Sequence, residues 1–188
     1  MNDSENTPKR WSLIRSERGP ELPLFQVRYD LVESPRNSMR MRAIVLETPD
    51  WVNIVAVTAA GKIVVVKQYR FGVGKITTEI PAGIVDPGET HQQAAIRELK
   101  EETGYTASEW RYMGWVEPNA AFLNNRCHHW FACNVTKTES LGLDESEDIS
   151  VCEISFQELR REIDEGRMRN GLSLLALSHS FDLWKLCE

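Results

Sequence analysis

The sequence predicts an α+β fold organised around one short helix with clear boundaries. First, the stretch from His91 to Thr103 carries signals for both the start and the end of a helix. Second, apolar segments with partial alternation lie before and after it, as expected of strands. Third, Ser155 and Glu158 have the spacing of a capping box, which predicts another helix near the C-terminal end.

Composition limits the class of protein. A chain of 188 residues with 41% apolar residues can form one domain with a sizeable core. The net charge of -6 gives no electrostatic footprint for nucleic acid or for an anionic membrane. The four cysteines have neither metal-ligand spacing nor a disulfide pattern. The first ten residues resemble no signal peptide, so we expect a cytoplasmic protein.

The N-terminal part predicts a β-hairpin. Residues Leu24–Val32 and Arg40–Leu46 alternate in part and flank a polar break, which is typical of two paired strands. We therefore divide the chain into 1–45, a tail with dimerisation strands, and 46–188, the main domain. Apolar strands outside a core need a covering surface, so a second copy of the chain is one interpretation. The alternative is that they extend the chain's own sheet.

The next segments form a second predicted hairpin and a short strand. Trp51–Thr58 and Ile63–Tyr69 flank the turn at residues 59–62, and Thr77–Pro81 follows a glycine-containing loop. Beyond the central helix, we expect strands at Trp110–Trp115 and His129–Thr136. The loop between these last two strands is a candidate substrate loop.

The C-terminal part predicts one strand and two helices. We expect a strand at Ile149–Ile154, a helix from Ser155 to about Gly166, and a final amphipathic helix over Leu172–Leu186. The expected core residues of the final helix are Leu174, Leu175, Leu177, Phe181 and Trp184. The adjacent His128 and His129 point to opposite faces of a strand, so we interpret them as structural rather than as joint metal ligands.

The central helix is well delimited. Thr90 is the expected N-cap, Gln93 completes a capping box, and Gly104 ends the helix. Spacings of three and four define the stripe expected to pack inward, which comprises Ala95, Ile96, Leu99 and Thr103.

Another face of this helix is unusually acidic. Glu98, Glu101 and Glu102 lie close together, and each like-charged pair costs roughly 0.2–0.5 kcal/mol. Arg97 offsets only part of this cost, and Glu89 adds a fourth carboxylate just before the helix. A hard divalent cation with oxygen ligands would offset the rest. The alternative is an ordinary solvated acidic face.

The stretch from Gly83 to Tyr105 resembles the Nudix box. This resemblance favours a metal site over an ordinary solvated acidic face. The positions that fit are Gly83, Glu89, Arg97, Glu98, Leu99, Glu101, Glu102 and Gly104, whereas Tyr105 stands where the family usually has an aliphatic residue. The resemblance implies a Nudix fold, with a mixed β-sheet sandwiched between helices and an N-terminal β-hairpin extension. It also implies a magnesium-dependent hydrolase of nucleoside diphosphates linked to another group.

Flanking segments resemble the ADP-ribose pyrophosphatase and nucleoside-diphosphate-sugar hydrolase branch of this family. Glu79-Ile-Pro-Ala-Gly83 matches the segment that leads into the box, and Pro118 lies at a similar place beyond it. The acidic segment 143–149 is similar to a loop whose glutamate acts on the attacking water. Position by position, that residue is Glu147, with Glu145 as the alternative. Members of this branch typically form homodimers through N-terminal strands.

The resemblance implies the following site. Glu98 and Glu102, with the Ala82 carbonyl, bind magnesium, with manganese as an alternative ion. Glu101 and Glu89 are further metal ligands, or they hold Arg97 and the box loop in place. Arg97 itself is assigned as a catalytic residue, together with Glu147 and Glu145. Fork-shaped guanidinium donors suit a diphosphate or a sugar. The substrate-binding candidates are Arg70, Arg126, Glu79, Trp51 and Tyr29, and the two aromatic residues have core packing as their alternative.

The predicted function is hydrolysis of ADP-ribose or a related nucleoside diphosphate sugar to a nucleoside monophosphate and a sugar phosphate, by a homodimer. The alternatives are a hydrolase of GDP-mannose or another nucleoside diphosphate derivative, and a non-catalytic Nudix module that binds ADP-ribose. The sequence leaves the base, the sugar and the number of metal ions open.

Overall fold

The computed structural model describes residues 7–142 and 148–183, which fall into two units. The first unit holds the residues up to 49 together with 119–125, and the second holds 50–118 and the residues from 126 onward. Each unit is described by itself.

The first unit is a three-stranded antiparallel sheet with the order β1-β2-β3. Its strands are β1 (Ser12–Glu21), β2 (Gln26–Glu33) and β3 (Arg40–Glu47). The predicted hairpin is present as β2 and β3, and β1 was not predicted. β1 is an almost wholly exposed edge strand. Such a strand is held by backbone hydrogen bonds to β2 and buries almost no side chains. Its sequence therefore shows little alternation of apolar and polar residues.

The second unit is built on an eight-stranded mixed sheet. Its main path has the order β11-β5-β4-β10-β8, and β6, β7 and β9 pair with β5, β4 and β10. β4 and β10 are parallel, whereas the other pairs are antiparallel. The strands are β4 (Trp51–Thr58), β5 (Ile63–Arg70), β6 (Lys75–Glu79), β7 (Ala82–Ile84), β8 (Tyr105–Thr106), β9 (Glu109–Val116), β10 (Cys127–Lys137) and β11 (Ile149–Ile154).

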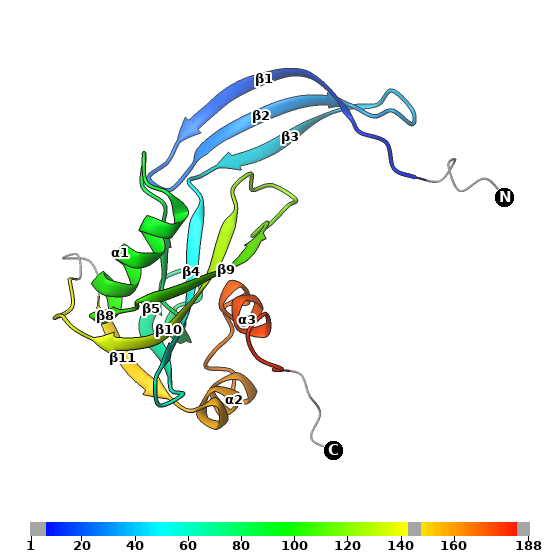
Figure 1. Cartoon of the computed structure of the whole chain (residues 1–188). Coiled ribbons are helices and arrows are strands. Elements are labelled where there is room, and N and C mark those ends of the chain that lie inside the picture. Colours follow the sequence, from blue (N-terminus) through cyan, green and yellow to red (C-terminus); the bar gives the residue numbers. More distant parts are fainter. Residues whose placement is uncertain (1–6, 143–147, 184–188) are drawn as a thin grey trace. The chain divides into compact units, whose positions relative to one another are not determined.

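Helices cover both faces of this sheet (Figure 1). They are α1 (His91–Thr103), α2 (Phe156–Asp164) and α3 (Gly171–Ser178). Ile54 of β4 packs in one core with α1, whereas its neighbour Val55 packs in a second core with α2 and α3. Because β4 is buried on both faces, it reads as an apolar run. The predicted mixed sheet between helices is confirmed.

Helix α1 has the predicted boundaries. Thr90 and Gln93 form the capping box, and Gly104 ends the helix in the left-handed conformation at φ 73°. The predicted inward position of Ile96 is wrong, because this side chain is 44% exposed. Ala94 is fully buried instead. The face of α1 that packs on the sheet comprises Ala94, Ala95 and Leu99, and Ile96 lies at the edge of this face.

Helix α3 is shorter than predicted. It ends at Ser178, and the backbone N–H groups of Ser180 and Phe181 both bond the carbonyl of Leu177 in a tight turn. This turn brings Leu183, 2% exposed, into the core.

The expected core side of this helix needs one correction. Leu177 is buried as predicted, whereas the core position predicted for Leu175 is wrong, because Ala176 faces the sheet instead and Leu175 is exposed. Leu174 and Phe181 pack at the margin of the core, and Trp184 lies outside the described residues.

In the part of the chain that the structure describes, no helix has both the length and the apolar character needed to cross a membrane.

Candidate active site

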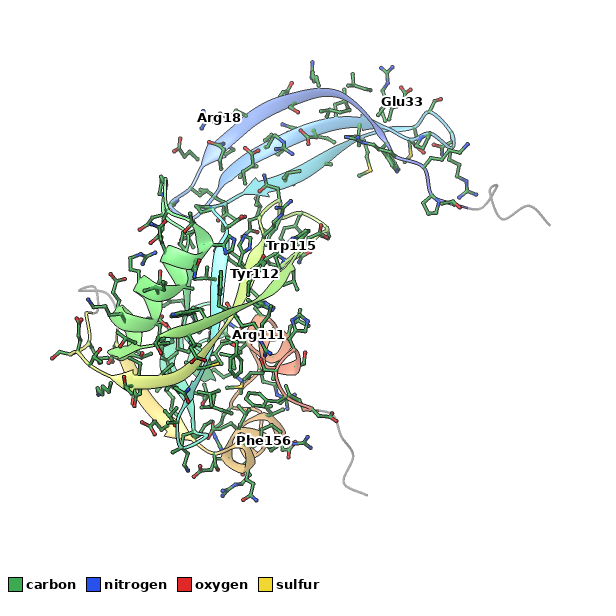
Figure 2. All side chains as sticks on the ribbon, viewed as in Figure 1. Arg18, Glu33, Arg111, Tyr112, Trp115 and Phe156 are labelled. Carbon is green, nitrogen blue, oxygen red and sulfur yellow. The ribbon has the colours of Figure 1, made fainter. Side chains whose placement is uncertain are left out.

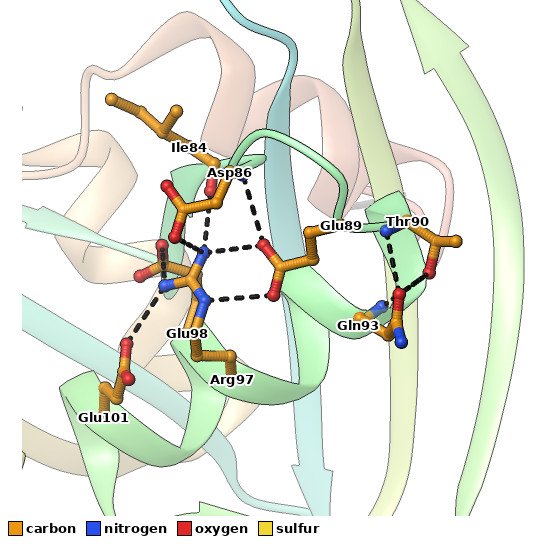
Figure 3. Close-up of polar contacts among 8 residues, drawn as sticks. All are labelled: Ile84, Asp86, Glu89, Thr90, Gln93, Arg97, Glu98 and Glu101. Atoms are coloured by element: carbon orange, nitrogen blue, oxygen red, sulfur yellow. Dashed lines mark hydrogen bonds and ion pairs between the residues drawn. The ribbon is translucent and has the colours of Figure 1, made fainter.

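Arg97 is the centre of the acidic cluster on α1 (Figure 3). Its Nε and Nη2 atoms donate to the two carboxylate oxygens of Glu89 at 3.1 and 3.0 Å. Its Nη1 atom donates to Glu98 at 2.8 Å and to Glu101 at 3.0 Å, and Nη2 also bonds the carbonyl of Ile84 at 2.9 Å. One guanidinium therefore holds carboxylates from the box loop and from two turns of the helix.

These contacts fix the charge states of the cluster. Hydrogen bonds to Glu89 and the other carboxylates raise the pKa of Arg97 above its ordinary value, so the guanidinium stays charged. The same bonds lower the pKa of Glu89, whose carboxylate also accepts the backbone N–H of Asp86 at 3.2 Å. Glu89 therefore ties the box loop to Arg97.

Glu98 lies against the backbone of β7. A Cβ built at Gly83 would overlap the carboxyl group of Glu98, so another residue here would push that carboxylate away from the strand. Gly83 thus allows the close approach of the Glu98 side chain to β7.

Glu102 reaches the neighbouring residue of the same strand. Its side chain is almost buried, with the residue 4% exposed, and it accepts the backbone N–H of Ala82 at 3.0 Å. Glu98 and Glu102, one helical turn apart, therefore lie against consecutive residues of β7. Glu101 differs from both, because its side chain is 44% exposed and bonds Arg97.

The donor set fits a hard divalent cation. Carboxylate oxygens and a backbone carbonyl are the ligands that magnesium prefers, and Gly83 leaves the space that Glu98 needs. Among the described residues, no three acidic, histidine or cysteine side chains already converge as a group able to hold a metal ion. The ligand roles of Ala82, Glu89, Glu98, Glu101 and Glu102 stay predictions.

Arg70 and Glu79 form a second ion pair, at the ends of the adjacent strands β5 and β6. Arg70 donates to both carboxylate oxygens of Glu79, with Nε at 2.9 Å and Nη2 at 2.8 Å. Glu79 is 1% exposed, whereas the side chain of Arg70 is 42% exposed. The pair therefore presents a guanidinium, not a carboxylate, at the surface.

The other predicted substrate contacts lie in different places. Trp51 begins β4, and its backbone N–H bonds the carbonyl of Arg126, whose guanidinium lies 4.4 Å from the centre of the Trp115 ring. Tyr29 belongs to the N-terminal unit, where Arg42 lies 3.7 Å from its ring centre. The roles of Trp51, Arg126 and Tyr29 in binding substrate stay predictions.

The predicted water-activating residues, Glu147 and Glu145, lie outside the described residues. The chain is described again from Asp148, and Ile149 opens β11 opposite Gln68 of β5. This register places the start of β11 close to the end of β5, where Arg70 lies.

A cluster of aromatic and histidine side chains holds the start of α1. The sequence did not predict this cluster. His91 and His128 stack with their ring centres 4.2 Å apart, and Trp130 donates its Nε1–H to His91 at 3.1 Å. His128 also contacts the Tyr112 hydroxyl at 2.8 Å and Asp50 at 3.2 Å. Burial and the neighbouring His128 lower the pKa of His91.

This cluster fixes the first residue of the acidic helix to β9 and β10. Tyr112 and Trp115 lie on β9 in Figure 2. His129 faces the opposite side of β10, near His179. The two adjacent histidines therefore contact different layers, as the alternation of a strand requires.

Comparison with known proteins decides the family. A model of the NUDIX domain matches residues 48–175, which include every residue of the Arg97 cluster. The chain belongs to the NUDIX domain family. The predicted enzyme class, a Nudix pyrophosphohydrolase, is confirmed.

Two bacterial relatives cover most of the chain. It is 33% identical over 157 residues to the methanol dehydrogenase activator of Bacillus methanolicus, covering 83% of this chain and 84% of that protein. It is 32% identical over 149 residues to the ADP-ribose pyrophosphatase of Bacillus subtilis strain 168, covering 79% and 80%. The predicted resemblance to the ADP-ribose pyrophosphatase branch is borne out.

A solved structure described as an ADP compounds hydrolase has the same fold. Its TM-score is 0.81 at 21% identity, over 93% of this chain and 94% of that one. The Nudix fold predicted from the sequence is thereby confirmed.

Proposed function

We propose that this Nudix protein hydrolyses the pyrophosphate bond of ADP-ribose or a related nucleoside diphosphate sugar. The products are a nucleoside monophosphate and a sugar phosphate. The observation that carries the proposal is the pair Glu98 and Glu102, which lie against consecutive residues of β7 beside the guanidinium of Arg97. Such a site suits a cation and an anionic diphosphate, and the relationship to an ADP-ribose pyrophosphatase supports the substrate class.

Glu98 and Glu102 would hold magnesium, or manganese in its place, together with the Ala82 carbonyl. When bound, this ion neutralises phosphate oxygens and lowers the pKa of water. Arg97 keeps Glu98, Glu101 and Glu89 oriented. With several carboxylates fixed in advance, little reorganisation is needed when the charged substrate arrives.

Arg70 binds the diphosphate, because a guanidinium matches two phosphate oxygens as a planar fork. Glu79 acts on the substrate through Arg70. Arg126 is a second cationic contact, and Trp51 and Tyr29 contact the base.

Glu147 accepts a proton from the attacking water, with Glu145 as the alternative. The new P–O bond forms at one phosphorus, the P–O bond to the bridging oxygen breaks, and that oxygen leaves on the second phosphate.

We further propose a homodimer formed through residues 1–45, with 46–188 as the catalytic domain. The three-stranded sheet exposes large apolar side chains, which are Leu13, Ile14, Met41 and Ile44. Exposed apolar surface of this kind is typical of an interface. Sedimentation at micromolar concentration tests this directly, and a monomer would contradict it.

The decisive experiment measures products from ADP-ribose, ADP-glucose, GDP-mannose, UDP-glucose and NADH with magnesium, resolved by chromatography. We expect AMP and ribose 5-phosphate from ADP-ribose at the highest rate, and no products after chelation of the metal. Gln92→Ala, at an exposed position on α1, is the control variant and should keep the wild-type rate.

Two outcomes would contradict the proposal. Faster cleavage of GDP-mannose would contradict the expected preference for ADP-ribose and favour the alternative activity, GDP-mannose hydrolysis. Binding of ADP-ribose without magnesium and without turnover would favour a binding module instead.

A further inference from the structure

The ion pair between Arg70 and Glu79 is held by one nearby donor and by one donor from a distant part of the chain. Each carboxylate oxygen of Glu79 accepts one bond from Arg70 and one from a neutral group. The Thr77 hydroxyl donates to Oε1 at 2.6 Å, and the Asn170 side-chain amide donates to Oε2 at 2.8 Å. Thr77 is two residues away, whereas Asn170 comes from the start of α3.

The four hydrogen bonds keep Glu79 ionised in spite of its burial. Burial alone would raise the pKa of its carboxyl group, but the bonds from Arg70, Thr77 and Asn170 outweigh it and lower the pKa. The carboxylate therefore stays a two-point acceptor that determines the plane of the Arg70 guanidinium.

Asn170 uses both ends of its amide. Its Oδ1 atom accepts the backbone N–H groups of Leu172 and Ser173 at 3.0 and 3.1 Å, which caps α3. Because backbone N–H groups can only donate, the oxygen must face them and the NH2 group must face Glu79. The geometry thus fixes the orientation of the amide.

The surrounding contacts hold Asn170 in register with β6. The N–H of Thr78 donates to the carbonyl of Arg167 at 3.0 Å, and the Thr78 hydroxyl donates to Glu162 at 2.7 Å. The N–H of Ile80 donates to the Ser173 hydroxyl at 3.4 Å. Three consecutive residues, 78–80, are therefore each bonded to the segment from α2 to α3.

We propose that Asn170 is a positioning residue for the reaction. It fixes Glu79, and Glu79 directs the guanidinium of Arg70 toward the substrate diphosphate. This inference rests on the proposed function for the role of Arg70. Asn170 itself touches no substrate, and its signal in the sequence is only that of an N-cap.

The test separates the two ends of the amide. Asn170→Ser keeps an N-cap oxygen, because serine is a good capping residue, but its side chain is too short to donate to Glu79. We expect KM to rise about tenfold with kcat nearly unchanged, because Arg70 binds substrate and transition state alike. Ala176→Gly is the matched control, since it weakens α3 at a buried position whose side chain has no hydrogen-bond donor for Glu79.

A double-mutant cycle tests whether the effect passes through Arg70. Arg70→Lys removes the fork, so Asn170→Ser should add little to KM in that background. Additive effects on kcat/KM would overturn the proposal. An equal rise in KM in Ala176→Gly would also overturn it, because the cause would then be loosening of α3.

A spectroscopic readout needs no turnover. The side-chain Nε–H of Arg70, identified by its loss in Arg70→Lys, should shift and exchange faster with solvent in Asn170→Ser but not in Ala176→Gly. An unchanged signal overturns the proposal even if the protein cleaves ADP-ribose. A shifted signal with unchanged KM overturns it as well. If the wild type cleaves no nucleotide, the proposed function fails, and the NMR signal still reports whether Asn170 orients Arg70.

Discussion

Two of the arginine–carboxylate assemblies of this protein, the Arg97 cluster and the Arg70–Glu79 pair, differ in charge balance. Arg97 pairs with four carboxylates, those of Asp86, Glu89, Glu98 and Glu101, so that cluster keeps an excess of negative charge. Arg70 donates to both carboxylate oxygens of Glu79, which accept their other hydrogen bonds from the neutral side chains of Thr77 and Asn170. The first assembly suits a cation and the second suits an anion. In the proposed function, the first would hold the metal ion and the second would bind the diphosphate.

Removing one carboxylate from the first assembly should have the largest effect. Glu98→Gln keeps the shape of the side chain but loses the charge beside Gly83, so turnover should fall to well below about a tenth of the wild-type rate. Steady-state kinetics with magnesium check this, with Gln92→Ala as the control. A rate above that level would mean that Glu98 does not hold the metal.

The second prediction concerns the proposed general base, Glu147. Glu147→Gln should lower kcat about a hundredfold and leave KM almost unchanged, because a general base acts on the transition state. Glu145→Gln is the matched control in the same segment. If Glu145→Gln is the slow variant and Glu147→Gln is not, the two roles are exchanged.

The third prediction affects the second assembly. Glu79→Gln replaces one acceptor with a donor, which then faces a group that can only donate. We expect KM to rise about tenfold, kcat to change little, and stability to fall by about 1–3 kcal/mol. The magnesium concentration at half-maximal rate should not move. A shift of that concentration would mean that the Arg70–Glu79 pair also affects metal binding, which contradicts separate roles for the two assemblies.

The smallest expected effect concerns His129, a fully buried group whose ring nitrogens have no hydrogen-bond partner among the described residues. Burial and the nearby His179 lower its pKa to about 4 from 6.5. The folded protein therefore binds the proton less readily than the unfolded chain does.

Stability should be complete above about pH 6.5 and should fall as the pH drops toward 4. Between about pH 7.5 and about pH 5 the loss is about 2 kcal/mol from this group. Chemical unfolding at both pH values measures it. His129→Leu should flatten the dependence, whereas Gln92→Ala, at an exposed position on α1, should retain it. An unaltered slope in His129→Leu would assign the loss to another group.

The sequence by itself determined α1 and its acidic face. The capping box of Thr90 and Gln93 and the left-handed Gly104 are local signals, which act within one turn of the chain. The box residues Glu89, Arg97 and Glu98 meet for the same reason, since they lie within three turns of one another. Strands such as β4 and β5 were readable because burial on both faces leaves an apolar run.

Only the tertiary structure decided the contacts between distant segments. Whether Ile96 or Ala94 faces the sheet depends on the angle at which α1 packs. The place of Glu98 against Gly83, and the bond from Asn170 to a carboxylate 91 positions earlier, follow from layers packed together after the chain has folded. Short-range spacing specifies a helix and its charges, whereas long-range packing decides what those charges meet.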